Sequence, residues 1–278
     1  MRLAISNIAW DITEDDAIAM ILNKFGVDAI DIAPGKYFPD TATATVQDIS
    51  RIKNWWSEKG IEITGMQALL FGTTGLNVFG LPAVQDTMLH HLTAICRIGG
   101  ELDAKRLVFG SPKNRDRTGL NDAKALDVAV SFFQRLGDIA QSYGVVICLE
   151  PNPTRYGANF MTTSVETMNV VKQVSHRSVQ MQLDTGALAI NDENPVRVLK
   201  DCASLIGHVH ASEPDLVPLG DGGVDHAKVA TALEQYLPDS VVSIEMLATK
   251  NEPHEVSINR ALNVAIWNYR NHGVEINK

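Results

Sequence analysis

Four residues whose side chains can bind a metal follow short apolar segments in the second half of the chain. They are Glu150 in ICLE, Asp184 in MQLD, His210 in GHVH and Glu245 in VSIE. Carboxylates and imidazole are common donor groups for divalent cations in proteins. Each of these residues is separated from the next by about the length of one strand and one helix. The pattern predicts a metal site to which four successive strands each contribute one side chain.

Strand geometry would turn these side chains toward a common point. Successive residues of a strand face opposite sides of a sheet, so Cys148 and Glu150 share the face opposite to Leu149, and His208 shares a face with His210. Several carboxylates in an apolar interior are costly unless a positive charge compensates them, and a divalent cation supplies that charge. One acidic residue at a strand end is more often a helix cap or an ion-pair partner, so the prediction depends on the four together.

The rest of the chain alternates short β-branched segments with longer segments of helical spacing. The expected strands are residues 3–8, 29–33, 62–70, 106–110, 145–150, 179–184, 206–210 and 241–246. The expected helices are residues 13–25, 46–59, 84–99, 122–143, 164–174, 195–202, 225–235 and 255–270. Eight βα units predict an α/β fold, a single closed (β/α)₈ barrel, with residues 1–278 forming one domain. Two dinucleotide-binding halves are disfavoured because the first strand runs into SNIAWD, which contains no glycine.

Caps and loops complete this expected arrangement. Thr13 and Asp225 are expected to cap the helices that begin beside them. The segments 71–82 and 111–119 are longer than ordinary connections and follow the third and fourth strands. Loops in this position would lie over the mouth of the barrel, where they often contact substrate.

Composition narrows the classes of partner. The 278 residues carry 24 Lys and Arg against 33 Asp and Glu, a net charge of −9, and no basic run that would bind nucleic acid. No stretch approaches the ~18 apolar residues of a membrane span, and MRLAISNIAWDITEDD turns acidic where a signal peptide would stay apolar. We expect a cytoplasmic protein without a membrane partner. The cysteines, Cys96, Cys148 and Cys202, lie far apart and indicate no disulfide framework.

The ordered motifs resemble a known family. LEPNP, LDTG, HVHASEPDLVPLGDGGVDH and SIEM are similar to motifs of the sugar phosphate isomerase/epimerase family. These are xylose-isomerase-like barrels that include ketose 3-epimerases, inosose-processing enzymes and hydroxypyruvate isomerases. SNIAW and DAIDIAPGKYF resemble the first two strands of the family, so the resemblance covers essentially the whole chain. It says little about the substrate.

The resemblance implies one divalent cation held by Glu150, Asp184, His210 and Glu245, with the two glutamates also carrying protons on opposite faces of a sugar. This donor set favours Mn²⁺, then Mg²⁺, and also admits Zn²⁺ or Co²⁺. The implied activity is that of a metal-dependent isomerase or epimerase that removes a proton beside the carbonyl of a small sugar or sugar phosphate. Two alternatives stay open: a metal-dependent lyase of the inosose or dehydroshikimate dehydratase type, and a non-catalytic sugar-binding barrel. Whether the chain forms a homo-oligomer is also open.

Two positions depart from the family pattern. Ala187 stands where members commonly have a histidine that holds substrate oxygens, and Leu216 stands where the epimerases commonly have an arginine. Both changes remove polar substrate contacts, and neither removes a metal ligand. They favour a less polar or differently arranged substrate pocket.

Five further polar residues are candidates for substrate contact, because they are expected near the mouth of the barrel or on its inward face. They are Lys36, Gln67, Asn152, Gln182 and His208. Two of them also have a plainer interpretation. His208 would equally serve as a packed or supporting residue, and Lys36 would either pair with Asp31 or meet a phosphate or carboxylate of the substrate.

Overall fold

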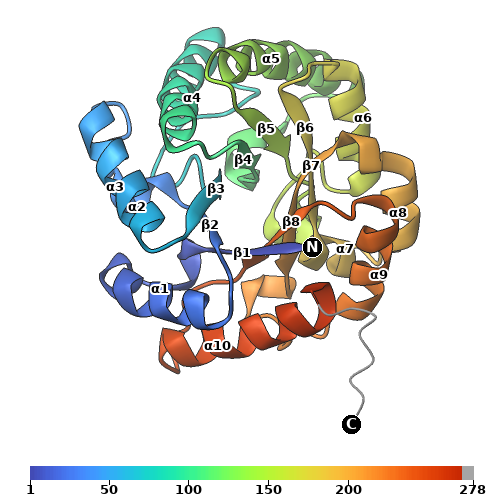
Figure 1. Cartoon of the computed structure of the whole chain (residues 1–278). Helices are drawn as coiled ribbons and strands as arrows, with labels where there is room; N and C mark the ends of the chain where they lie inside the picture. The colour runs from blue at the N-terminus through green and yellow to red at the C-terminus, as the bar shows by residue number, and fades with distance from the viewer. Residues whose placement is uncertain (271–278) are drawn as a thin grey trace.

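A computed structural model describes residues 1–270 as a closed barrel of parallel strands surrounded by helices (Figure 1). Neighbouring strands follow chain order, and the last pairs with the first through Leu3 and Val242. The predicted (β/α)₈ barrel is therefore confirmed. Its strands are β1 Arg2–Ser6, β2 Ala29–Ile32, β3 Glu62–Met66, β4 Arg106–Phe109, β5 Val146–Leu149, β6 Val179–Asp184, β7 Ile206–Ser212 and β8 Val241–Glu245.

Helices form the outer layer and cover every strand (Figure 1). They are α1 Asp15–Lys24, α2 Pro34–Tyr37, α3 Val46–Glu58, α4 Pro82–Leu102, α5 Asp122–Ser142, α6 Ser164–Val174, α7 Thr185–Ile190, α8 Pro195–Cys202, α9 His226–Tyr236 and α10 His254–Ala265. Each expected helix is present, whereas α2 and α7 were not expected because they are too short to show a helical period. None of these helices is both long and apolar enough to cross a lipid bilayer.

One of the two expected caps is found. Asp225 caps α9, since its carboxylate accepts a hydrogen bond from the amide of Lys228 at 3.0 Å. The expectation for Thr13 is wrong. A short 3₁₀ turn precedes α1, and its cap is Asp11, which accepts from the amide of Thr13 at 3.0 Å while Glu14 accepts from the amide of Asp11 at 2.9 Å. The helical backbone thus begins at Ile12, one residue before the expected start, and α1 itself begins at Asp15.

The main apolar core lies between the strands and the helices. Ile147 and Leu149 of β5 belong to this core, whereas Cys148 is buried outside it, as the alternation of strand residues predicts. In α5, the ring of Phe133 is fully buried and meets the edges of Phe109 at 5.3 Å and Phe132 at 5.4 Å between ring centres. This packing fixes α5 against β4, and so supports the end of β5 from which Glu150 follows.

Replacement of Phe133 by alanine is expected to lower the free energy of unfolding by about 3–5 kcal/mol, because a fully buried ring is removed and its cavity is only partly refilled. Urea unfolding followed by circular dichroism measures the change. Met20→Ala is the matched control, since Met20 is 68% exposed on α1, and its effect is expected within about 0.5 kcal/mol. Equal effects of the two substitutions would contradict this account of the core.

Candidate functional site

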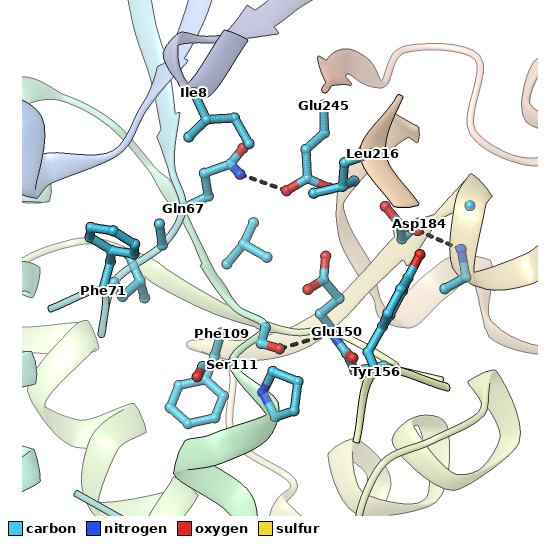
Figure 2. Close-up of a pocket in the computed structure, with 18 of the residues that line it drawn as sticks. Ile8, Gln67, Phe71, Phe109, Ser111, Glu150, Tyr156, Asp184, Leu216 and Glu245 are labelled. Atoms are coloured by element: carbon cyan, nitrogen blue, oxygen red, sulfur yellow. Dashed lines mark hydrogen bonds between the residues drawn. The ribbon is translucent and has the colours of Figure 1, made fainter. Parts of the chain in front are cut away.

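A cavity of about 730 Å³ opens at the carboxyl ends of the strands. Loops after the strands form its walls, and Glu150, Asp184 and Glu245 point into it (Figure 2). This is the face at which the active sites of (β/α)₈ enzymes lie, because eight loops converge there on a rigid barrel. The cavity is therefore the candidate functional site.

The four predicted metal ligands meet at the floor of this cavity. Glu150, Asp184, His210 and Glu245 each offer a donor atom, and these atoms lie within 4.8 Å of one another. His210 Nδ1 is 3.2 Å from Glu245 Oε2 and 3.6 Å from Glu150 Oε1. Strand register explains the convergence, because Asp184 on β6 pairs directly with His210 on β7. Residues far apart in the sequence thus reach one point at one height in the barrel.

Hydrogen bonds fix the orientation of two of these carboxylates. Asp184 accepts from the hydroxyl of Ser212 and from the amide of Ala187, both at 2.6 Å. Glu245 Oε1 accepts from the side-chain amide of Gln67 at 2.6 Å, as Figure 2 shows. Sequence analysis missed Ser212, although it lies two residues beyond His210 on the same face of β7. These donors hold the carboxylates before any ligand binds.

The cluster carries an excess of negative charge. Burial, together with the charges of Glu245 and Glu150, raises the pKa of Asp184. Burial by itself would lower the pKa of His210, but the charges and hydrogen bonds of the same glutamates outweigh it and raise that pKa well above its usual value. Without a cation, these shifts favour bound protons on Asp184 and His210. Three carboxylates and one imidazole are a donor set suited to a divalent cation, which would replace those protons.

A further carboxylate lies behind His210. Asp31 Oδ2 is 2.9 Å from His208 Nε2 and 4.0 Å from His210 Nε2. Burial would raise the pKa of Asp31, but the neighbouring histidines outweigh it and lower the pKa to about 2. Asp31, His208 and His210 are also close enough to hold a cation. However, Asp31 Oδ2 lies closer to His208 than to His210, so we interpret the Asp31–His208 pair as support for the imidazole of His210.

The other candidates for substrate contact separate into two groups. Lys36, Gln67 and Asn152 line the cavity. His208 and Gln182 do not, because they lie deeper in the barrel than His210, and His208 Nδ1 is 3.1 Å from the side chain of Gln182. His208 instead lines a separate cavity of about 460 Å³ near the amino ends of the strands. His208 and Gln182 thus form a polar layer beneath the cluster, and the expectation that they touch substrate stays a prediction that this placement does not support.

The expected ion pair between Asp31 and Lys36 is wrong, because Asp31 pairs with His208 instead. The Lys36 ammonium donates to the backbone carbonyl of Asn7 at 2.6 Å and to that of Trp10. The second interpretation, contact with a substrate, stays a prediction, since Lys36 lines the cavity while its ammonium is held by these carbonyls.

Arg115 supports the site through Glu150, although sequence analysis did not single it out. Its side chain is fully buried and donates to the carbonyl oxygens of Glu150 at 2.6 Å and Gly110 at 3.2 Å. Burial lowers the pKa of Arg115 to about 10, although the charge of Glu150 acts in the opposite direction. Gly110 also leaves room for the side chain of Glu150, since a Cβ at this position would lie 1.9 Å from Glu150 Oε2. Arg115 and Gly110 together position Glu150.

The closed barrel and the carboxylate cluster at the carboxyl ends of its strands place the protein among (β/α)₈ proteins with a site at the mouth of the barrel. The model of the family of xylose isomerase-like TIM barrels matches residues 21–264, and the chain belongs to this family. Among curated proteins, the L-ribulose 3-epimerase of Methylomonas sp. is 32% identical over 107 residues, and the D-psicose 3-epimerase of Ruminiclostridium cellulolyticum is 28% identical over 105 residues. These matches cover 38% of this chain in both cases, and 37% and 36% of the relatives.

Solved structures agree with this fold over nearly the whole chain. A D-psicose 3-epimerase from Clostridium cellulolyticum, solved with D-tagatose, has a TM-score of 0.80 at 20% identity, covering 97% of this chain and 99% of that one. The 3-keto-D-glucoside 4-epimerase from E. coli has a TM-score of 0.75 at 18% identity, covering 95% and 99%. At this level of identity the likeness establishes the fold.

Metal content tests the cluster. Purified protein is expected to bind about one Mn²⁺ per chain, and His210→Ala and Asp184→Asn are each expected to weaken binding by at least about tenfold, because the remaining three donors cannot replace the lost one. Elemental analysis measures the metal content, and isothermal titration calorimetry measures the affinity. Asp215→Asn is the control, since Asp215 lines the same cavity outside the cluster. Unchanged affinity in both ligand variants would exclude this metal site.

Proposed function

We propose that the protein is a metal-dependent isomerase or epimerase that acts on a small polyhydroxy ketone or aldehyde. The observation that carries this proposal is the convergence of Glu150, Asp184, His210 and Glu245 at the floor of the cavity. The similarity to ketose 3-epimerases over part of the chain supports it. Among the cations that the donor set admits, we propose Mn²⁺, because oxygen donors outnumber nitrogen three to one.

Two carboxylates of the cluster can also transfer protons. A divalent cation bound there would polarise the carbonyl and adjacent hydroxyl of the sugar, which makes the neighbouring C–H more acidic. Glu150 follows β5 and Glu245 ends β8, so their carboxylates approach the cavity from different sides (Figure 2). One glutamate would remove the proton while the other returns a proton to the opposite face. Gln67 holds Glu245 in place for this role.

The charge of the cavity favours an unphosphorylated sugar. The described lining includes the carboxylates of Glu150, Asp184 and Glu245, and that of Asp215, which is paired with Arg155. Its one cationic side chain is that of Lys36, whose ammonium donates to two backbone carbonyls. A phosphate would find no unengaged cationic side chain there to pair with. We therefore propose a neutral sugar as the substrate.

Solvent exchange tests the proposed proton transfers. In D₂O with saturating Mn²⁺, the wild-type protein is expected to incorporate deuterium at the carbon beside the carbonyl of a ketose such as D-fructose. Glu150→Gln and Glu245→Gln are each expected to lower net epimerisation by about 10²-fold or more, with slow exchange retained in at least one of them. NMR of the sugars measures both quantities, and Glu101→Gln, an exposed change on α4, is the control.

The products separate the alternatives. An enone or enol product would indicate a lyase, and ligand-induced stabilisation without turnover across a sugar panel would indicate a binding protein. Turnover without deuterium from solvent would point to a hydride shift and contradict the proton-transfer roles of the two glutamates.

A further inference from the structure

The cavity has two chemically different parts. Its floor is formed by the carboxylate cluster together with Gln67. Much of the remaining surface is apolar and comes from loops that follow four different strands. We call this part the apolar wall, and it consists of Leu69, Leu70, Phe71, Pro112, Leu216 and Leu247.

Two side chains of the apolar wall are largely exposed to solvent. Phe71 is 86% exposed and Leu247 is 52% exposed, yet both line the cavity. Figure 2 shows Phe71 on the far side of the cavity from Asp184. Removing apolar surface of this size from water is favourable, so an apolar group bound in the cavity would be stabilised by covering these side chains.

The backbone beside Leu216 is strained in a way that keeps this residue at the cavity. Asp215 and Leu216 have φ values of 60° and 53°, in the left-handed region that non-glycine residues rarely occupy. The amide of Leu216 donates to the carbonyl of Glu213 at 3.0 Å, and the carbonyl of Leu216 accepts from the amide of Leu247 at 2.9 Å. These bonds hold Leu216 beside Glu245 (Figure 2). An apolar residue is thus kept next to the cluster at an energetic cost.

The size and charge of the cavity limit what can fill it. A volume of about 730 Å³ falls in the range of pockets that enclose drug-sized ligands, about 300–1,000 Å³. A six-carbon sugar held at the floor would leave the apolar wall uncovered. The lack of an unengaged cationic side chain in the described lining disfavours an anionic group in the remaining space.

We propose that the apolar wall binds an uncharged alkyl or aromatic substituent carried by the substrate at the end remote from its reacting carbonyl. This inference rests on the proposed function, because it takes the polyhydroxy end of the substrate to lie at the carboxylate cluster. Binding energy from such a remote group also raises the rate when it positions the reacting carbon between Glu150 and Glu245. The substrate class is then a neutral, substituted ketose in place of a free or phosphorylated one.

A matched pair of ligands tests the apolar wall. The probes are 6-O-methyl-D-fructose and 6-O-benzyl-D-fructose, which differ in the size of the apolar group, titrated into Mn²⁺-loaded protein by calorimetry. The benzyl ether is expected to bind at least about tenfold more tightly, the ratio that partial burial of a phenyl ring supplies. D-Fructose 6-phosphate is expected to bind no better than the methyl ether.

Variants assign that gain to the apolar wall. Phe71→Ala combined with Leu247→Ala is expected to reduce the benzyl-to-methyl ratio to about threefold or less, and both sites are exposed enough for the variant to fold. Leu81→Ala is the control, since Leu81 is 76% exposed and outside the cavity lining, and it is expected to keep the full ratio. Equal binding of the two ethers, no binding of either, tighter binding of the phosphate, or a full ratio in the double variant would overturn the proposal.

Failure of this proposal is distinguishable from failure of the proposed function. Deuterium exchange into unsubstituted D-fructose tests the glutamates without the apolar wall. Exchange without a benzyl gain would reject the apolar wall alone. A benzyl gain without exchange into any ketose would reject the catalytic roles and leave the apolar wall as a binding site.

Discussion

The electrostatic cost of placing three carboxylates together in the interior of a barrel governs the rest of the site. Glu150, Asp184 and Glu245 are held within a few ångströms of one another, where water cannot fully screen their repulsion. Hydrogen bonds from Ser212 and Gln67 reduce that cost and also fix where the oxygens point. The remaining charge is compensated by protons in the protein alone, or by a divalent cation, for which the donor set is well suited. The proposed metal binding and the orientation of the glutamates proposed to transfer protons thus depend on the same interaction.

The barrel stabilises this arrangement because it fixes the position of each carboxylate along the barrel axis. Direct pairing of Asp184 with His210, and of Ser212 with Glu245, sets the relative positions of β6, β7 and β8. Arg115 binds the carbonyl of Glu150 and thereby fixes the end of β5. A buried layer formed by Asp31 and His208 supports His210 from below. Rigid surroundings of this kind reduce the reorganisation that charge developing in a transition state would otherwise require.

Much of this arrangement is predictable from the sequence, because it follows from periodicity. The βα alternation predicts the barrel, and the positions of four acidic or imidazole residues at strand ends predict which side chains meet. The depth of a side chain within the barrel is harder to predict from the sequence. Strand alternation puts His208 and His210 on one face but does not show that only His210 reaches the cluster. Arg115 ends a short 3₁₀ turn, Pro112–Arg115, in the connection after β4, and no local sequence pattern marks it as buried. The same holds for α7, whose six residues are too few to show a helical period.

The most direct test of the central claim is the position of a bound metal. Anomalous diffraction from a crystal grown with Mn²⁺ would locate the ion independently of any activity. The account predicts one strong peak coordinated by Glu150, Asp184, Glu245 and Nδ1 of His210, with Asp31 outside the coordination sphere. A peak between Asp31 and His208, or no peak at the four-residue cluster under saturating Mn²⁺, would contradict it.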